Sequence, residues 1–269
     1  MALAGITRTT GWNNIDRSCR SLLTLNRNRE YAVLCDMLAL KTTDRVLDVG
    51  SGDGFWTKRL AKRCGEVVGV EPDAQLREYA RQLNRAKNLT YVCAAAEHLP
   101  FEDHSFDKII SISCLEHFQD PFKGLQEMAR VLKPGGRVAL SVDSLLPENS
   151  DSEFREWHKR RHFVTRYFHE RDLCDALQSV GLNCEFGRTV HVFRSRIAQS
   201  VRRRFIRRPI VWMPLFPISY SIVRCADSLF AQTHGQIVIM TASASSAEST
   251  REKSCCNAGA MRSSQALMQ

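Results

Sequence analysis

Apolar residues follow two patterns that alternate along the chain: short continuous runs, and longer stretches in which they recur every three or four positions. The continuous runs predict buried strands, and the spaced stretches predict amphipathic helices. The predicted strands are Arg45–Val49, Val67–Val70, Thr90–Ala94, Lys108–Ser113, Arg137–Val142, Cys184–Val192 and Gly235–Thr241. The predicted helices are Asn28–Leu40, Ala74–Ala86, Pro121–Leu132 and Arg171–Val180. Strands that alternate with helices in this way are typical of a parallel sheet covered on both faces.

The composition fits a globular protein that carries one basic element. Of the 269 residues, 43% are hydrophobic and 25% are charged, which is an ordinary balance for a folded domain. Much of the formal net charge of +9 comes from seven arginines between positions 194 and 208, a stretch without acids. Positive charge gathered in one place argues against a nucleic-acid-coated surface and for one local basic element.

The cysteines and the first residues indicate neither a metal site nor a secreted protein. The ten cysteines form no C-x-x-C pair and do not stand with histidines at zinc-finger spacing, so we expect reduced, mostly buried thiols. Charged side chains interrupt the first thirty residues, which contain no apolar run typical of a secretory signal. We therefore expect no disulfide framework, no metal ligands and a cytoplasmic location.

The same patterns divide the chain into five parts. We expect an N-terminal helical cap over residues 1–40, a core over 41–194, a basic and apolar insertion over 195–233, and a last core strand over 234–241. Residues 242–269 are rich in Ser, Ala and Thr and poor in large apolar side chains. This composition predicts a disordered tail.

Chemistry enters where the first predicted strand runs into the glycine-rich sequence of residues 50–54. Glycines at every second position let the backbone turn tightly and approach a ligand where a Cβ atom would collide. The dinucleotide fingerprint G-x-G-x-x-G would need its third glycine at Phe55, so the spacing disfavours a nicotinamide cofactor. Glu71 ends the second predicted strand, where a carboxylate can accept both ribose hydroxyls of an adenosine.

Further motifs accompany the glycines and the acid. The motifs are Val46–Gly54, Gly69–Asp73, Ala96–Phe101, Ser105–Asp107, Ser113–Phe118 and Ala129–Arg137. In this combination the chain resembles the class I S-adenosylmethionine-dependent methyltransferases, in particular the methyltransferase type 11 branch that includes the ubiquinone and menaquinone C-methyltransferases. The resemblance covers residues 44–142 closely. It implies S-adenosyl-L-methionine as cofactor and a Rossmann-like α/β fold, with seven mostly parallel strands, an antiparallel last strand and a helical insertion before it.

The resemblance also implies which residues bind the cofactor. These residues are Asp48, Gly50, Ser51, Gly52, Gly54, Glu71, Pro72, Asp73, Ala96, Glu97 and Ser113. The loop backbone would hold the methionine part and Glu71 the ribose. The chain departs from the family at Ala95, where an acid usually binds the adenine amino group. Losing such a charge-assisted contact costs about 1.5 to 3 kcal/mol unless a substitute such as Glu97 replaces it.

His117 is the candidate catalytic residue, because the resemblance places the methyl group of the cofactor beside Ser113–Phe118. Methyl transfer from a sulfonium depends mainly on alignment and on the exclusion of water. A base is needed only when the acceptor must lose a proton, as a phenol or an acidic carbon does, and a histidine can supply it. The alternative is a histidine that merely packs under the following helix.

The insertion combines the arginines with an apolar and aromatic run interrupted by three prolines, Pro209, Pro214 and Pro217. It is too short for a membrane-spanning helix, which needs about 20 apolar residues. Two interpretations are open. The insertion is either an interfacial element with its arginines toward anionic headgroups, or a lid over the acceptor pocket with its arginines in solvent. Both favour a small, apolar acceptor such as a quinone precursor, a phenol or a lipid-like molecule.

Rival functions use the same features differently. A non-catalytic S-adenosylmethionine-binding protein would keep the glycine loop but lack a productive acceptor pocket, which Ala95 would suit. A membrane-surface adaptor would act through residues 194–220. A nucleic-acid partner fits poorly, because the arginines stand among prolines and aliphatic residues and no recognition helix or stacking platform is evident.

Overall fold

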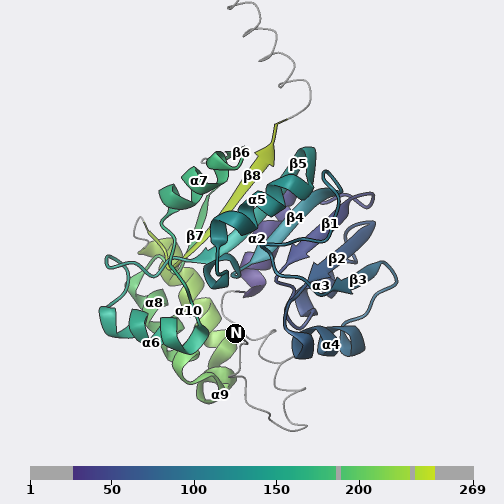
Figure 1. The fold of residues 1–269 in the computed structure, drawn as a ribbon. Coiled ribbons are helices and arrows are strands. Elements are labelled where there is room, and N and C mark those ends of the chain that lie inside the picture. The colour runs from purple at the N-terminus through teal and green to yellow at the C-terminus, as the bar shows by residue number, and fades with distance from the viewer. Residues whose placement is uncertain (1–26, 186–188, 231–233, 246–269) are drawn as a thin grey trace, which may run out of the picture.

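The computed structural model describes residues 27–185, 189–230 and 234–245, and these residues form one sheet with helices around it (Figure 1). The strands are β1 (Arg45–Val49), β2 (Glu66–Val70), β3 (Leu89–Val92), β4 (Phe106–Ile112), β5 (Leu132–Asp143), β6 (Leu182–Cys184), β7 (Val190–Val192) and β8 (Ile237–Ala244). Their order is β3-β2-β1-β4-β5-β8-β6, and β7 also pairs with β8. The predicted Rossmann-like α/β fold is confirmed.

The first five strands run parallel, and β8 runs antiparallel to β5, β6 and β7. The sheet holds eight strands in the described residues, rather than the predicted seven. The predicted strand Cys184–Val192 was the error, because its two ends belong to different strands. β6 bonds to residues 242–244 and β7 to residues 237–239, at opposite ends of the long β8. The apolar residues resume at β7 after the end of β6, so the sequence pattern alone could not separate the two strands.

The helices cover both faces of the sheet. They are α2 (Arg27–Leu38), α3 (Phe55–Leu60), α4 (Ala74–Leu83), α5 (Pro121–Val131), α6 (Ser152–His162), α7 (Glu170–Ser179), α8 (Arg196–Arg207), α9 (Pro209–Trp212) and α10 (Phe216–Leu229), with 3₁₀ turns η1 (Leu115–His117) and η3 (Met213–Leu215). One apolar cluster joins α5 and α7 to the sheet, and a second joins α2, α3, α8 and α10 to the other face. Burial of these apolar faces is the main force holding the layers together.

The insertion is helical, as predicted, and packs on the same face as α2. Ala198, Phe205 and Val223 of the insertion belong to one buried cluster with Leu34 of α2 and Ile239 of β8. In Figure 1, α6, α8, α9 and α10 gather at one end of the molecule, and α3 and α4 lie beside β2 and β3. Within the described ranges, no helix is long and apolar enough to cross a bilayer.

The ends of the chain compare only in part with the expectations. The predicted cap before residue 27 and the predicted tail after residue 245 lie outside the described residues. The last strand continues to Ala244, beyond the predicted end at Thr241, because Ser243 and Ala244 still pair with β5 and β6. The parallel strands place the carboxyl ends of β1, β2, β4 and β5 at one edge of the sheet, where ligands bind in open α/β folds.

Candidate cofactor and acceptor site

The glycine loop after β1 has a backbone that only glycine adopts easily. Gly50, Gly52 and Gly54 have φ angles of 80°, 54° and 77°, all in the left-handed region. A Cβ atom at Gly50 would lie 2.0 Å from Cys114 Sγ, so the glycine lets β1 and the turn after β4 pack closely. A Cβ atom at Gly52 would meet no protein atom within 4 Å. The loop therefore presents its backbone to open space at Gly52, which leaves room for a ligand.

Glu71 ties the end of β2 to this loop. Its Oε2 accepts a hydrogen bond from Gly52 N at 3.0 Å, and its Oε1 accepts one from Asp73 N at 2.9 Å. The side chain is 8% exposed, and burial raises the pKa of its carboxyl group. The two amides fix the carboxylate beside the open space over Gly52, with lone pairs left for a ligand hydroxyl.

Asp48 is buried near the end of β1, two residues before Gly50. Its Oδ2 accepts a hydrogen bond of 2.7 Å from Thr57 Oγ1, and burial raises the pKa of the carboxyl group to about 7. The hydroxyl of Ser51 is buried and has no protein partner among the described residues. An orphaned hydroxyl, a fixed carboxylate at Glu71 and open space over Gly52 are features that an adenosine-containing ligand would use. The loop therefore fits S-adenosylmethionine.

The other predicted cofactor residues divide between the loop and its supports. Pro72 is exposed, and Asp73 caps α4 by accepting hydrogen bonds from Gln75 N and Leu76 N at 2.8 and 2.9 Å. Such a cap stabilises the helix that carries the Glu71 turn. Asp73 therefore caps α4, and no contact among the described residues tests its predicted role in cofactor binding.

Ala96 and Glu97 follow β3 and lie next to the start of α5. Ala96 is buried, whereas Ala95 is exposed. Glu97 Oε1 accepts hydrogen bonds from Gln119 N at 3.0 Å and from Asp120 N at 3.3 Å. This oxygen is already used by the protein, so Glu97 is a poorer substitute for the missing adenine acid than the sequence alone suggests.

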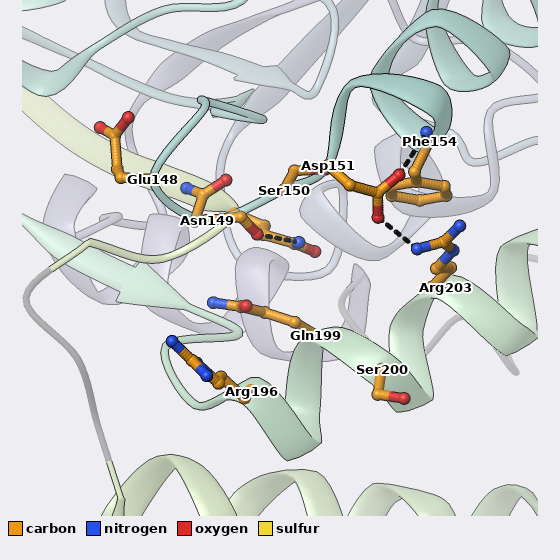
Figure 2. Close-up of a pocket in the computed structure, with 10 residues that line it drawn as sticks. Glu148, Asn149, Ser150, Asp151, Phe154, Arg196, Gln199, Ser200 and Arg203 are labelled. Carbon is orange, nitrogen blue, oxygen red and sulfur yellow. Dashed lines mark hydrogen bonds and ion pairs between the residues drawn. The ribbon is translucent and has the colours of Figure 1, made fainter.

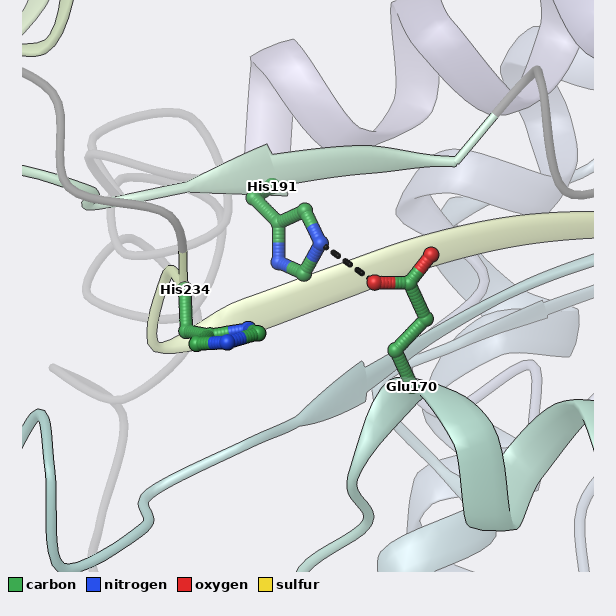
Figure 3. A group of neighbouring side chains, drawn as sticks. All are labelled: Glu170, His191 and His234. Carbon is green, nitrogen blue, oxygen red and sulfur yellow. Dashed lines mark hydrogen bonds and ion pairs between the residues drawn. The ribbon is translucent and has the colours of Figure 1, made fainter.

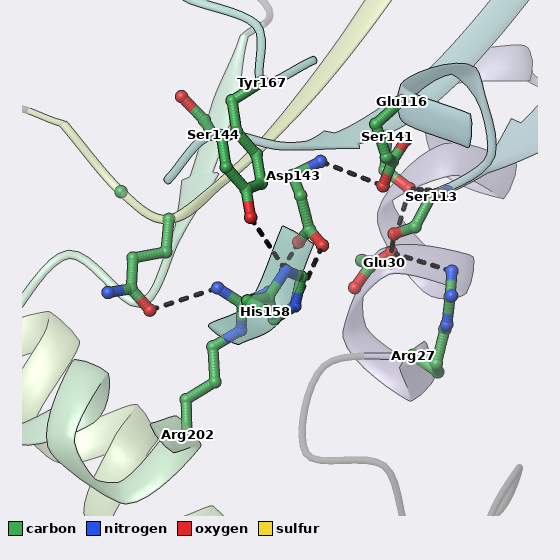
Figure 4. Close-up of polar contacts among 12 residues, drawn as sticks. Arg27, Glu30, Ser113, Glu116, Ser141, Asp143, Ser144, His158, Tyr167 and Arg202 are labelled. Carbon is green, nitrogen blue, oxygen red and sulfur yellow. Dashed lines mark hydrogen bonds and ion pairs between the residues drawn. The ribbon is translucent and has the colours of Figure 1, made fainter. Parts of the chain in front are cut away.

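Ser113 joins a buried polar group that the sequence did not reveal. Its Oγ donates to Glu30 Oε2 at 2.9 Å, and Ser141 Oγ donates to the same oxygen at 2.8 Å (Figure 4). Ser113 has a φ of 41°, which turns the chain sharply at the end of β4. Glu30 is fully buried on the face of α2 that also carries Leu34 and Leu38. An acid in register with an apolar helix face was the signal that could have identified it.

Glu116 lies one residue before His117 and points inward. It is fully buried, and its Oε1 accepts a hydrogen bond from Asp143 N at 3.2 Å. Burial and the nearby Asp143 raise the pKa of Glu116 to about 8, so the carboxyl group is largely neutral at pH 7. Its Oε2 is buried without a partner among the described residues. Glu116 therefore offers a free polar atom at the edge where the acceptor is expected.

His117 occupies the solvent side of the same 3₁₀ turn. Its Nδ1 lies 3.5 Å from Phe163 O, and the residue is exposed. Surrounding protein atoms that partly shield the ring from water nevertheless lower the pKa of His117. A neutral ring at neutral pH is the form that a general base requires. The catalytic role of His117 stays a prediction.

The insertion contributes Arg202 to this region. Arg202 is 3% exposed, and its Nη2 lies 2.5 Å from Asp143 Oδ1 (Figure 4). His158 Nε2 lies 3.6 Å from the other carboxylate oxygen, and His158 Nδ1 lies 3.0 Å from the Tyr167 hydroxyl. Burial alone would raise the pKa of Asp143, but Arg202 and His158 lower it below the ordinary value. Asp143 is therefore ionised, and its charge is compensated.

The expectation of arginines directed to solvent or to headgroups is therefore wrong for part of the cluster. Arg203 pairs with Asp151, and Arg207 lies 3.0 Å from Glu153. Both guanidinium groups also stack over Phe154 of α6, at 5.2 and 5.8 Å from the ring centroid. The acids that neutralise these arginines precede or begin α6, far away in the sequence, so the run looked unpaired.

A cavity of about 470 Å³ lies between α6 and α8 (Figure 2). Its lining residues are Glu148, Asn149, Ser150, Asp151, Phe154, Arg196, Gln199, Ser200, Arg203 and Gln236. Nine of the ten lining residues are polar or charged, and Phe154 is the apolar one. Gln236 connects the cavity to the buried network, since its Oε1 accepts from Arg202 Nη1 at 3.1 Å and its Nε2 donates to Asn149 O at 2.8 Å.

A parallel sheet, a left-handed glycine loop and a fixed acid at the end of β2 define a Rossmann-like nucleoside-binding domain. Residues 47–140 match the family model described as "Methyltransferase domain". The predicted resemblance to the S-adenosylmethionine-dependent methyltransferases is therefore confirmed over these residues.

Similar proteins agree with this assignment. The biotin biosynthesis bifunctional protein BioHC of Cellvibrio japonicus is 36% identical over 52% of this chain and 28% of its own length. The demethylmenaquinone methyltransferase of Tropheryma whipplei is 36% identical over 39% of this chain and 44% of its own length. The chain thus spans less than half the length of these two relatives. A geranyl diphosphate C-methyltransferase structure from Streptomyces coelicolor has the same fold, with a TM-score of 0.60, 18% identity, and coverage of 81% of this chain and 77% of that one.

Proposed function

We propose that the protein transfers the methyl group of S-adenosylmethionine to a small-molecule acceptor. The observation that carries this proposal is the Glu71 carboxylate, which Gly52 N and Asp73 N hold beside the open space over the glycine loop. Glu71 would bind the ribose hydroxyls, and the loop backbone with the Ser51 hydroxyl would bind the methionine part. The bound cofactor supplies an electrophilic methyl group on its sulfonium.

The acceptor would lie at the carboxyl ends of β4 and β5. Supporting this position, the unpartnered Oε2 of Glu116 lies in the same buried network as Asp143 and Arg202. A neutral carboxyl group can donate or accept a hydrogen bond, so it would orient one polar group of the acceptor and keep water from that group. An acceptor with an apolar body and one polar group, such as a phenol or a quinone precursor, fits this description.

Calorimetric titration with S-adenosylmethionine and with S-adenosylhomocysteine tests the cofactor part. We expect Glu71→Ala to lose about tenfold or more in affinity, because it removes the only carboxylate proposed for the ribose. Glu78→Ala is the matched control, since Glu78 is exposed on the adjoining helix α4. Equal affinity of Glu71→Ala and the parent protein would refute the assigned site.

Transfer of a labelled methyl group to a panel of phenols and quinone precursors tests the reaction itself. Label in the acceptor, abolished by Glu71→Ala, would establish the activity. Tight cofactor binding without transfer to any acceptor would instead favour the non-catalytic binding protein.

A second proposal concerns the exposed face of the insertion, which we infer to rest on an anionic membrane. Leu215, Ile218, Ile222 and Leu229 are all exposed, and they recur at helical spacing along α10 and the turn before it. Ile218 and Leu229 expose 60% and 72% of their surface. Arg208, the C-cap of α8, and Arg224 of α10 are also exposed in the insertion, and a surface with both cations and apolar side chains matches an anionic lipid surface.

Co-sedimentation with phosphatidylserine-containing vesicles tests this contact. We expect the protein to be enriched on the vesicles at low salt. The double variant Ile218→Asp and Ile222→Asp should abolish this enrichment, whereas the control Ser221→Asp, on the same helix, should keep more of it. Light scattering of the free protein tests the alternative that a second copy of the chain covers this face. A dimer that the double variant dissociates, with no enrichment on vesicles, would overturn the membrane proposal.

A further inference from the structure

Three side chains outside the cofactor site converge at the far edge of the sheet (Figure 3). Glu170 begins α7, His191 is the central residue of β7, and His234 precedes β8. His191 Nε2 lies 3.0 Å from Glu170 Oε2, and one side-chain donor atom from each of the three residues lies within 4.8 Å of the other two. All three residues are half-buried, so the cluster is partly shielded from solvent yet accessible.

The backbone brings these residues together by a close passage at Gly235. A Cβ atom at Gly235 would lie 2.4 Å from Val192 O, so only glycine lets the chain run this tightly against β7. The passage places His234 beside His191, with their ring centroids 6.0 Å apart. His169, which caps α7, adds a third imidazole, and its ring centroid lies 5.3 Å from that of His234. The cluster is therefore set by the fold rather than by a local sequence motif.

We propose that Glu170, His191 and His234 bind a divalent transition-metal ion of the zinc type. Two imidazoles and one carboxylate are a ligand set that zinc uses when a fourth position is left to water. Ligands about 2.0 to 2.1 Å from a tetrahedral ion lie about 3.3 Å apart, close to the observed Nε2 to Oε2 separation. The harder ions Mg²⁺ and Ca²⁺ prefer oxygen ligands, so two histidines disfavour them.

The ion would hold in place the segment before β8, which supports the buried polar network around Arg202. His234 is two residues before Gln236, whose side chain contacts both Arg202 and the Asn149 carbonyl. A metal ion that joins α7, β7 and this segment would restrain all three in the folded state. It would therefore stabilise the native protein increasingly as the free metal concentration rises above the dissociation constant, because the unfolded chain lacks the preformed site. This role does not depend on the proposed methyl transfer.

Titration of chelator-treated full-length protein with Zn²⁺ tests the site. We expect one ion per chain at the cluster, and at least about tenfold weaker binding in His191→Ala and in His234→Ala. His98→Ala is the matched control, because His98 is an exposed histidine beside Lys123 and outside the cluster. Glu170→Gln keeps the shape of the side chain and removes its charge, so it weakens binding without a packing defect. Excess Mg²⁺ should not compete.

Titration with Co²⁺ separates this site from the cysteines, because thiolate ligands give an ultraviolet charge-transfer band and histidine and carboxylate ligands do not. We expect visible bands of a four-coordinate ion without the thiolate band, and a rise in the thermal unfolding temperature on metal addition in the parent but not in His191→Ala. Unaltered Zn²⁺ affinity in His191→Ala, His234→Ala and Glu170→Gln would overturn the proposal. A dominant thiolate band that survives in these variants would overturn it as well.

Discussion

Arg202 of α8 and Asp143 at the end of β5 form a buried ion pair, with Nη2 and Oδ1 2.5 Å apart. The pair connects the insertion to the edge of the sheet where the acceptor is expected. Because the Asp143 carboxylate also contacts His158 and its backbone N–H donates to Glu116, this one residue links three other segments of the chain. Removal of one partner leaves a charge in a place that water reaches poorly.

Arg202→Met should therefore destabilise the protein by about 3 to 5 kcal/mol, since it leaves Asp143 buried without its main counter-charge. Urea unfolding measures the free energy of unfolding. Arg204→Met is the control on the same helix, because Arg204 is exposed and should change stability by less than about 0.5 kcal/mol. The double variant Arg202→Met and Asp143→Leu should recover part of the loss. Equal losses of stability in Arg202→Met and in the control Arg204→Met would contradict the proposed role of the pair.

The raised pKa of Glu116 predicts a specific pH dependence. Its folded-state pKa of about 8 lies above the ordinary value of 4.5, so the folded state holds the proton more tightly than the unfolded state does. This contribution to stability is complete below pH 4.5 and is lost as the pH rises to about 8. Glu116→Gln stays neutral, so its free energy of unfolding should fall less than that of the parent across this window. Parallel pH profiles of the two proteins would contradict a raised pKa.

Gly52→Val should abolish S-adenosylmethionine binding while the protein stays folded. The side chain would enter the open space that the ligand is proposed to use, and the left-handed backbone would cost about 1 to 2 kcal/mol. Calorimetry measures binding, and thermal unfolding measures the stability change. Gly135→Val is the control for backbone strain alone, because Gly135 is also left-handed, lies outside the loop and, apart from its chain neighbours, has no atom of the described residues within 4 Å of the added Cβ. Retained binding in Gly52→Val would show that the ligand lies elsewhere.

Ala95→Asp should strengthen cofactor binding. It supplies the acid that the family resemblance implies for the adenine amino group, at a position that is exposed in this structure. A charge-assisted hydrogen bond of about 1.5 to 3 kcal/mol corresponds to a tightening of about tenfold or more. Calorimetric titration compares this variant with Ala94→Asp, which adds the same charge one residue earlier. A similar gain in both variants would indicate a general charge effect and not an adenine contact.

His117→Gln tests the general-base hypothesis separately from cofactor binding. If His117 takes a proton from the acceptor, its loss should lower kcat for a phenolic acceptor by about 10²- to 10⁴-fold and leave the affinity for S-adenosylmethionine unchanged. The pH profile of kcat should then lose its ascending limb. If Glu116→Gln lowers kcat in this way while His117→Gln stays fully active, the general base is Glu116 and not His117.

The sequence by itself determined the parts of this protein that local geometry controls. The glycine loop and Glu71 were predicted because a strand, its tight turn and the next strand end form one contiguous motif, and the amide contacts of Glu71 confirm its position beside the loop. Alternating apolar patterns were sufficient for the parallel half of the sheet. They failed for α6, whose eleven residues are mostly charged, and at the break between β6 and β7.

Only the tertiary structure decided which polar residues became buried partners. Arg202 looked solvated because its partner Asp143 lies 59 residues away, and Glu30 contacts Ser141 across 111 residues. The cluster of Glu170, His191 and His234 likewise has no sequence spacing typical of a metal site. Pairings of this kind depend on the order of strands and on which helix covers which face, so the chain must first pack before these charges and ligands meet. A local pattern encodes conformation, whereas the environment of a charged group is set by residues that the fold brings from elsewhere.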